Sequence, residues 1–391
     1  MTGRNRVLFS FLGLFLFFCQ SCNGFLTHHS ISPKVSSSNL VLKSTKNGDV
    51  VVEQIELSSG VTAEIMSCSP RDDSISSSSS PLESMMQLLA KQIIGTSENN
   101  PGKKPPLIFI HGSFHASWCW TEHYFSFFQN MGYPCYALSL RGTGGTYAGD
   151  GITRVKISEH VQDVSAFIDY VIQQQPTSTS FSATPPVLIG HSFGGMPIMK
   201  YLELNNNDNN NDDFSSWKEK LSGVILLCSV PPSGNGKMTM RFLQRSLRDS
   251  WKITAGLAMR KVINDDNLCR TLFFGDDGDG GISDDDLHRI QGYFLRDTVA
   301  TIDLRDLAGK LPSNLIDVQG RAPFLSAFDP PLPALVIGAK DDFIVDKEGV
   351  EETATYFGVD PIIVDSPHDV MLGNKWANTA NIIKDWLETI I

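Results

Sequence analysis

The chain has 391 residues, of which 41% are hydrophobic, enough for one large globular domain with an insertion or for two smaller ones. Its first 48 residues include five basic and no acidic residues, so the remainder holds 27 basic against 43 acidic residues, a formal charge of −16. Such a charge repels nucleic acid and anionic lipid headgroups, and the sequence predicts neither as a partner.

The N-terminus has the pattern of a targeting leader. Two arginines precede an apolar run of 13 residues, 7–19, which is shorter than the about 20 residues that a membrane span needs. Residues 1–24 therefore predict a cleaved signal peptide, so that no stable membrane span remains after the leader is removed. Residues 25–48 are rich in Ser and Thr, lightly basic and free of acids, which is typical of a disordered transit peptide.

A signal peptide followed by a transit segment that begins with Phe25 resembles the bipartite leaders of proteins imported into secondary plastids of diatoms and their relatives. This resemblance implies a plastid location. The alternative is secretion, or retention in the endomembrane lumen, with a disordered N-terminus. The five cysteines beyond the leader are odd in number and lack a zinc-site spacing, so we expect reduced, buried thiols, which favours a plastid interior.

Residues 49–230 form the first part of the predicted core and alternate β-rich runs with amphipathic segments. An antiparallel hairpin is expected at 50–57 and 61–68, followed by an insertion at 69–104 that is largely Ser-rich. The later expected elements are the strands 107–110, 135–140, 187–189 and 224–230 and the helices 118–131, 157–172 and one that ends at Leu204.

Residues 231–329 lose this alternation and predict a helical cap, with helices at 243–263 and 283–296. The second part of the core, residues 330–391, resumes it. Its expected elements are the strands 334–337 and 362–364 and a closing helix at 376–387. Strands and helices that alternate around an inserted helical block predict an α/β fold with a mostly parallel, doubly wound sheet.

A Gly-x-Ser-x-Gly motif at 190–194 carries the strongest chemical signal. It follows a buried strand and leads into a helix, which is the order of a nucleophile elbow. There the serine sits on a strained turn, and glycines on either side leave room for it. We therefore predict Ser192 as a nucleophile, the alternative being a glycine-rich turn that happens to contain a serine.

A serine hydroxyl needs a base within hydrogen-bond reach, and after such an elbow the acid and then the histidine follow along the chain. Two histidines remain beyond Ser192. His288 lies in an expected solvated helix, whereas His368 follows the last strand, so His368 is the predicted base. The loop after strand 334–337 offers the acid that orients it: Asp342 is predicted, and Asp341 stays open as the alternative.

An oxyanion intermediate needs two backbone donors. We expect the N–H groups of Phe193, directly after the nucleophile, and of Ser113, in the turn after strand 107–110. His111 is expected to brace this turn by hydrogen bonding. The predicted substrate pocket is aromatic, and His115 either contacts substrate there or packs the loop. Its members are Phe114, His115, Phe273 and Phe274.

Residues 108–120, in which His-Gly is followed by Trp-x-Trp, resemble the oxyanion loop of the α/β-hydrolase superfamily, nearest to the plant methylesterase and hydroxynitrile lyase branch. Residues 140–144 are similar to its Arg-Gly-x-Gly turn. Residues 367–372 resemble the segment around the catalytic histidine in lysophospholipase-like members. The resemblance covers about 105–230 and 330–391 and implies an α/β-hydrolase fold, but it leaves the substrate open.

The sequence thus predicts a serine hydrolase that cleaves carboxylic esters or related acyl bonds of a small, largely apolar substrate through an acyl-enzyme. No cofactor or metal is expected, since nucleophile, base and acid are all side chains. An acidic stretch from Asp276 places Leu287 where a calcium loop needs a Glu, so no calcium site is predicted. The alternatives are a hydrolase-shaped receptor with little turnover and a hydroxynitrile-lyase-like enzyme.

Overall fold

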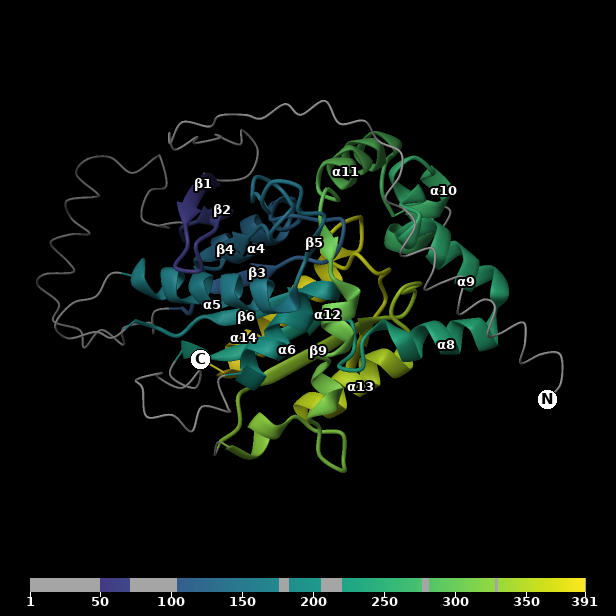
Figure 1. Ribbon diagram of the computed structural model, residues 1–391. Coiled ribbons are helices and arrows are strands. Elements are labelled where there is room, and N and C mark those ends of the chain that lie inside the picture. Colours follow the sequence, from purple (N-terminus) through teal and green to yellow (C-terminus); the bar gives the residue numbers. More distant parts are fainter. Residues whose placement is uncertain are drawn as a thin grey trace, which may run out of the picture.

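The computed structural model describes residues 50–70, 104–175, 183–204, 220–275, 281–327 and 330–390. The predicted leader, most of the insertion 69–104 and the start of the acidic stretch at 276–280 lie outside the described residues. The described helices and strands form one central sheet with helices on both faces (Figure 1).

The central sheet has eight strands in the order β1-β2-β4-β3-β6-β7-β9-β10. They are β1 (Val51–Glu56), β2 (Thr62–Cys68), β3 (Leu107–Ile110), β4 (Cys135–Leu138), β6 (Val187–His191), β7 (Gly223–Leu227), β9 (Ala334–Ala339) and β10 (Ile362–Val364). The hairpin β1–β2 joins β4 in antiparallel fashion, and all other neighbours are parallel. The predicted mostly parallel sheet is confirmed.

Successive side chains of each strand point to opposite faces of the sheet and pack into two separate hydrophobic cores. In β3, Leu107 and Phe109 point to one core and Ile108 and Ile110 to the other, and all four are fully buried. One face carries α3 (Trp118–Thr121), α4 (Tyr124–Asn130) and α14 (Trp376–Ile390). The face toward the viewer in Figure 1 carries α5 (Ile157–Gln173) and α6 (Gly195–Leu204), and α13 (Lys347–Phe357) packs into the same core.

The described residues 235–327, between β7 and β9, are mainly helical, and we call them the cap segment. They contain α8 (Asn235–Arg245), α9 (Leu247–Ile253), α10 (Asp266–Cys269), α11 (Asp284–Arg296), α12 (Leu304–Ala308), several single turns and the short strand β8 (Thr301–Ile302). This strand pairs in parallel with β5 (Arg154–Val155), which ties the cap segment to the core. The helices α8 to α11 lie to the right in Figure 1. The predicted domain boundaries stay predictions.

Two predicted elements are wrong in the cap segment and beside it. The single helix expected at 243–263 is broken at Ser246, whose extended backbone (φ −157°, ψ 110°) ends α8, and whose hydroxyl accepts the Asp249 N–H at 3.2 Å to start α9. The strand expected at 224–230 stops at Leu227, because Cys228 takes a positive φ of 44°.

The helix expected at 118–131 is also wrong in one respect, since it forms two short helices. His123 has φ −138°, which interrupts the helical backbone between α3 and α4. The five cysteines in the described part of the chain are free and buried, which confirms the predicted buried thiols. Within the described ranges, no helix combines the length and apolar character needed to cross a bilayer.

Candidate active site

The strand β6 ends in a strained turn that carries Ser192. The serine has φ 52°, a left-handed conformation that a residue with a side chain adopts only when its surroundings impose it. Gly194 is essential to this turn, because a Cβ there would lie 2.4 Å from the Ile110 carbonyl oxygen. The turn then continues directly into α6. The predicted strand–turn–helix arrangement is therefore present.

The structure brings the three predicted triad residues together. The Ser192 Oγ lies 3.0 Å from Nε2 of His368, and both carboxylate oxygens of Asp342 lie 2.9 Å from Nδ1 of the same ring. The side chains of His368 and Asp342 are buried, with exposed fractions of 1% and 0%. Hydroxyl, imidazole and carboxylate thus form one continuous hydrogen-bonded chain.

The loop after β9 selects Asp342 rather than Asp341 for contact with the histidine. Its carboxylate Oδ1 accepts the backbone N–H groups of Ile344 and Val345, both at 2.8 Å, which fixes the side chain toward the ring. Asp341 is exposed, and its backbone N–H donates to the Ser366 carbonyl at 3.1 Å. Of the two carboxylates that the sequence left open, only Asp342 is bonded to His368.

Two effects oppose each other at the His368 ring. Burial disfavours its charged form, but the Asp342 carboxylate outweighs burial, so the pKa of His368 is raised above 6.5. This environment stabilises the imidazolium that forms when the ring takes a proton. The His368 side chain can therefore act as a proton acceptor from Ser192, provided that the pH lies above its own pKa.

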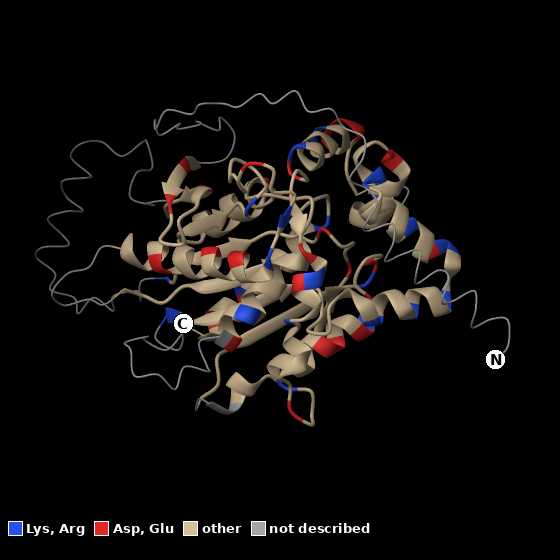
Figure 2. Ribbon diagram, in the orientation of Figure 1, with Lys and Arg blue, Asp and Glu red and all other residues tan. Residues whose placement is uncertain are grey.

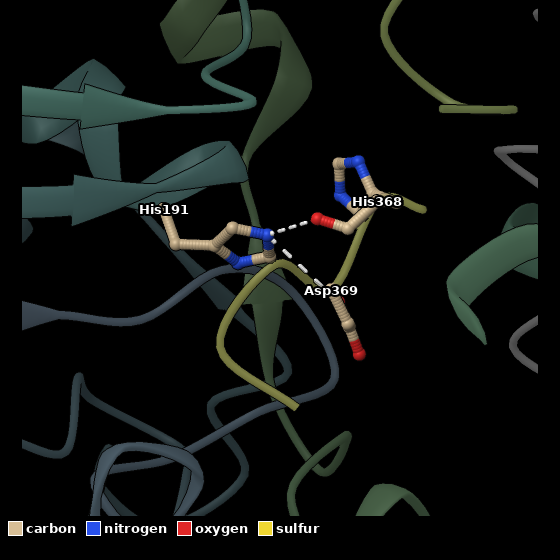
Figure 3. A group of neighbouring side chains, drawn as sticks. All are labelled: His191, His368 and Asp369. Atoms are coloured by element: carbon tan, nitrogen blue, oxygen red, sulfur yellow. Dashed lines mark hydrogen bonds and ion pairs between the residues drawn. The ribbon is translucent and has the colours of Figure 1, made fainter. Parts of the chain in front are cut away.

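Two clusters of potential metal ligands share His368. One joins it to His191 and Asp369 (Figure 3) and the other to Cys228 and Asp342, with ligand atoms within 4.8 Å of one another. The ring nitrogens of His368 are already bonded to Ser192 and Asp342. In the first cluster, Nε2 of His191 is bonded to the His368 carbonyl, and the Asp369 carboxylate is bonded to His115. We therefore propose no metal site at either cluster.

The turn after β3 lies against the nucleophile. A Cβ on Gly112 would come within 2.8 Å of the Ser192 Cβ, so only glycine allows this approach. Ser113 follows, exposed, and Phe114 takes a positive φ of 71°. Phe193 is the first residue after the nucleophile. The chain segments that carry the two predicted oxyanion donors, Ser113 and Phe193, therefore both adjoin Ser192.

His111 braces this turn as predicted. Its Nδ1–H donates to the Gly112 carbonyl at 2.8 Å, and its Nε2 accepts the Leu140 N–H at 2.9 Å. Burial lowers the pKa of His111 to about 4, so the ring stays neutral at physiological pH. The oxyanion loop and the start of the turn after β4 are held together by one imidazole.

The predicted pocket residues form an aromatic cluster beside the triad. The Phe273 ring centroid lies 6.1 Å from those of both His368 and Phe114, and Phe274 packs on Phe273 at 6.4 Å. His115 belongs to this cluster but is fully buried. Both of its ring nitrogens are bonded, to the Ser113 carbonyl at 2.9 Å and to the Asp369 carboxylate at 3.0 Å. Of the two roles considered for His115, the structure shows loop packing.

Sequence reasoning missed Asp369, the residue after the predicted base. Its carboxylate is fully buried, bonds His115 and lies 3.8 Å from Nε2 of His191, which in turn donates to the His368 carbonyl at 3.0 Å (Figure 3). A signal was available. Asp369 precedes the buried apolar run 370–372, where an acidic side chain needs a buried partner.

A cavity of about 700 Å³ lies between the cap segment and the loops after β9 and β10. Its lining residues include Phe274, Lys340, Asp342, Phe343, Pro367 and Leu372. Ser192 is not among the lining residues and is 8% exposed. The cavity therefore adjoins the acid and histidine loops, and of the four predicted pocket residues only Phe274 is among its lining residues.

Comparison with known sequences gives one family-level result. A profile described as the Alpha/beta hydrolase family matches residues 107–380, which is more than half of the chain. No curated protein sequence matches the chain.

Solved structures with similar folds include several hydrolases. A laboratory-evolved variant of a potato epoxide hydrolase is 13% identical, with a TM-score of 0.55 over 87% of this chain and 99% of that one. An epoxide hydrolase from Vigna radiata is 14% identical, with a TM-score of 0.53 over 88% and 99%. A thermophilic esterase from Thermogutta terrifontis is 14% identical, with a TM-score of 0.50 over 87% and 98%. At such identities the likeness shows the fold alone.

Proposed function

The chain belongs to the alpha/beta hydrolase family, and from this premise we propose that it is a serine hydrolase of carboxylic esters or related acyl bonds. The observation that supports the proposal is the unbroken hydrogen-bonded chain from Asp342 through His368 to Ser192, with distances of 2.9 and 3.0 Å. A serine placed on a base that is itself oriented by a carboxylate is the arrangement that acyl transfer requires.

In the first half-reaction, the Ser192 Oγ attacks the carbonyl carbon of the ester while Nε2 of His368 takes the hydroxyl proton. The tetrahedral intermediate collapses as His368 gives that proton to the alcohol oxygen, and the C–O bond to the alcohol breaks. Asp342 stays ionised and holds the Nδ1–H, which keeps the ring in the correct tautomer and stabilises the imidazolium.

In the second half-reaction, water replaces the alcohol. His368 takes one proton from water as its oxygen attacks the acyl carbon, and the proton then returns to the Ser192 oxygen as the acid leaves. In both steps the oxyanion is bound by the N–H groups of Phe193 and Ser113, each contributing about 3 kcal/mol of barrier reduction. Residues of this chain therefore supply every proton transfer of the cycle.

The nucleophile favours ester cleavage over epoxide opening. Family members that open epoxides or remove halogens use a carboxylate at the elbow, whereas this chain has Ser192 there. The apolar side chains of Phe274, Phe343 and Leu372, which line the cavity beside the acid and histidine loops, favour a small, largely apolar acyl or alcohol portion.

Labelling with an alkyl fluorophosphonate tests the nucleophile directly. We expect stoichiometric labelling of the wild-type protein, none of Ser192→Ala, and hydrolysis of aryl esters of graded acyl length by the wild type alone. Rapid labelling without turnover of any ester would favour a hydrolase-shaped receptor and contradict the proposal. Release of cyanide from mandelonitrile without turnover of esters would contradict the proposal and indicate a lyase.

A further inference from the structure

His115 faces two hydrogen-bond acceptors inside the protein. Its Nδ1 lies 2.9 Å from the Ser113 carbonyl oxygen, and its Nε2 lies 3.0 Å from Oδ2 of Asp369, with both side chains of the latter pair fully buried. A carbonyl oxygen never donates, and an ionised carboxylate does not either. Nδ1–H of His115 therefore donates to the Ser113 carbonyl, and one proton lies between Nε2 of His115 and the Asp369 carboxylate.

Aromatic rings surround the pair. The indole of Trp118 stacks on His115 at 5.6 Å with an interplanar angle of 22°, and the Phe294 ring lies 4.9 Å away. Burial alone would raise the pKa of the Asp369 carboxyl group, yet the neighbouring His115 ring holds it below its usual range.

The pair joins the oxyanion loop to the loop that carries His368, and the proposed reaction needs these two loops in a fixed relative position. His115 holds the carbonyl of Ser113 in the oxyanion loop, and Asp369 is bonded through the chain to His368. The backbone N–H of Asp369 also donates to the Phe273 carbonyl of the cap segment at 3.0 Å. His191 adds a further hydrogen bond, because its Nε2–H donates to the His368 carbonyl (Figure 3).

We propose that His115 and Asp369 form a buried hydrogen-bonded pair that positions the oxyanion loop relative to the catalytic histidine. Both are positioning residues, since neither one touches the hydroxyl of Ser192. Their role in turnover rests on the proposed hydrolase function. The hydrogen bond between them does not, and it can be measured in protein without activity.

The hydrogen bond of the pair is tested by nitrogen NMR of protein labelled with 15N-histidine, using His115→Gln to assign the signal. We expect Asp369→Asn to shift the Nε2 signal of His115, because this nitrogen lies 3.0 Å from Oδ2 of Asp369. A His115 Nε2 signal that Asp369→Asn leaves unchanged would overturn the pair. The result is independent of whether Ser192 reacts with any ester.

The positioning role is tested by Asp369→Asn, with Asp365→Asn as the control. Asp365 is an exposed carboxylate, with a side chain 63% exposed, only a few residues away. We expect Asp369→Asn to lower kcat about 10- to 100-fold with KM nearly unchanged, and the control to leave both unchanged. The double variant H115Q/D369N, whose two amide groups can bond each other, should be more active than Asp369→Asn alone.

Wild-type kcat in Asp369→Asn, measured on protein with an unchanged circular dichroism spectrum, would overturn the positioning role. So would a fall in activity that the double variant deepens rather than relieves. Loss of fluorophosphonate labelling in the wild-type protein itself would instead reject the hydrolase function, and the NMR result would stand.

A separate feature of the cap segment is an exposed apolar stripe on and after α9. Leu247 is 67% exposed, Trp251 56% and Met259 39%. Leu247 and Trp251 are four residues apart in the helix, so they share one face. Apolar side chains that gather on one exposed face are a candidate binding surface.

Basic side chains surround this stripe. Residues 247–261 contain four basic residues and one acidic residue in a chain whose formal net charge is −11. Figure 2 shows basic positions along α8 and α9. The ammonium of Lys252 lies 5.2 Å from the Phe343 ring centroid, while Arg248, Arg260 and Lys261 are exposed. Arg241 and Arg245 of α8 are already paired with Asp346 and do not belong to this basic surface.

We infer that this stripe docks the protein peripherally on an anionic phospholipid bilayer. Tryptophan and leucine enter the headgroup region, and flanking cations pair with lipid phosphates. From the sequence alone, the negative net charge of the chain is expected to repel anionic lipids. Charges more than about 8–10 Å away are largely screened at physiological salt, so the local cations dominate at contact.

Co-sedimentation of the full chain with vesicles tests this surface. We expect binding to phosphatidylcholine vesicles that contain about 30% phosphatidylglycerol, little binding to phosphatidylcholine alone, and weakening by salt. Trp251→Glu should reduce binding at least about tenfold. Leu295→Ser, at a residue 63% exposed on α11, is the matched control and should bind as the wild type does.

Equal binding by Trp251→Glu and wild type would overturn the lipid surface, as would binding that ignores phosphatidylglycerol. A concentration-dependent dimer that Trp251→Glu dissociates, without vesicle binding, would assign the stripe to a second copy of the chain and also overturn it.

Discussion

Replacing Asp342 by asparagine should reverse the hydrogen bond that orients the catalytic base. Oδ1 of Asp342 accepts two backbone N–H groups at 2.8 Å, so the oxygen of an asparagine must stay at that position. Its amide nitrogen then replaces Oδ2, one of the two oxygens that lie 2.9 Å from Nδ1 of His368. An amide N–H that points at Nδ1 favours the tautomer with the ring proton on Nε2.

A proton on Nε2 prevents His368 from accepting the proton of Ser192. The expected loss is about 10⁴-fold in kcat, or about 5.5 kcal/mol of transition-state stabilisation, because the geometry stays intact while the tautomer is wrong. The assay is steady-state hydrolysis of an aryl ester, with Asp341→Asn as the matched control. A kcat for Asp342→Asn within tenfold of wild type would refute the tautomer reasoning.

Three further predictions follow from the site. The kcat/KM for ester hydrolysis should fall as the pH drops through the raised pKa of His368, because the protonated ring cannot accept the proton of Ser192. A pH profile whose acid limb is centred below pH 6.5 would contradict this. Gly194→Ala should leave little folded protein, seen as a loss of soluble yield, since its Cβ meets a backbone oxygen at 2.4 Å. A reporter fused to residues 1–48 should reach the plastid, and signal confined to the secretory route would reject the leader prediction.

Much of the site was predictable because local chemistry dictates residue types. The elbow needs glycine beside Ser192, as the 2.4 Å approach to Gly194 shows. A base that reaches over the end of a sheet must follow its last strand, as His368 does, and its acid must lie in the loop after the strand before, as Asp342 does. Each constraint acts within a few residues, so the sequence pattern records it.

The parts that were missed depend on contacts between distant segments. His115 and Asp369 are 254 positions apart, and neither carries a local pattern that reveals the other. The break at Ser246 had a different cause. The apolar residues keep their helical spacing through Ser246. The Ser246 hydroxyl nevertheless caps the following helix, which requires an extended backbone at Ser246, and apolar spacing does not reveal such a cap.

The central claim is that an acyl group passes through Ser192. Rapid quenching after mixing with a p-nitrophenyl ester, followed by peptide mass spectrometry, measures this directly. The account predicts one acyl group on the peptide that contains Ser192, formed with a burst of nitrophenol and missing in Ser192→Ala. Ester turnover with an unmodified Ser192 peptide, or with the acyl group on another residue, would contradict it.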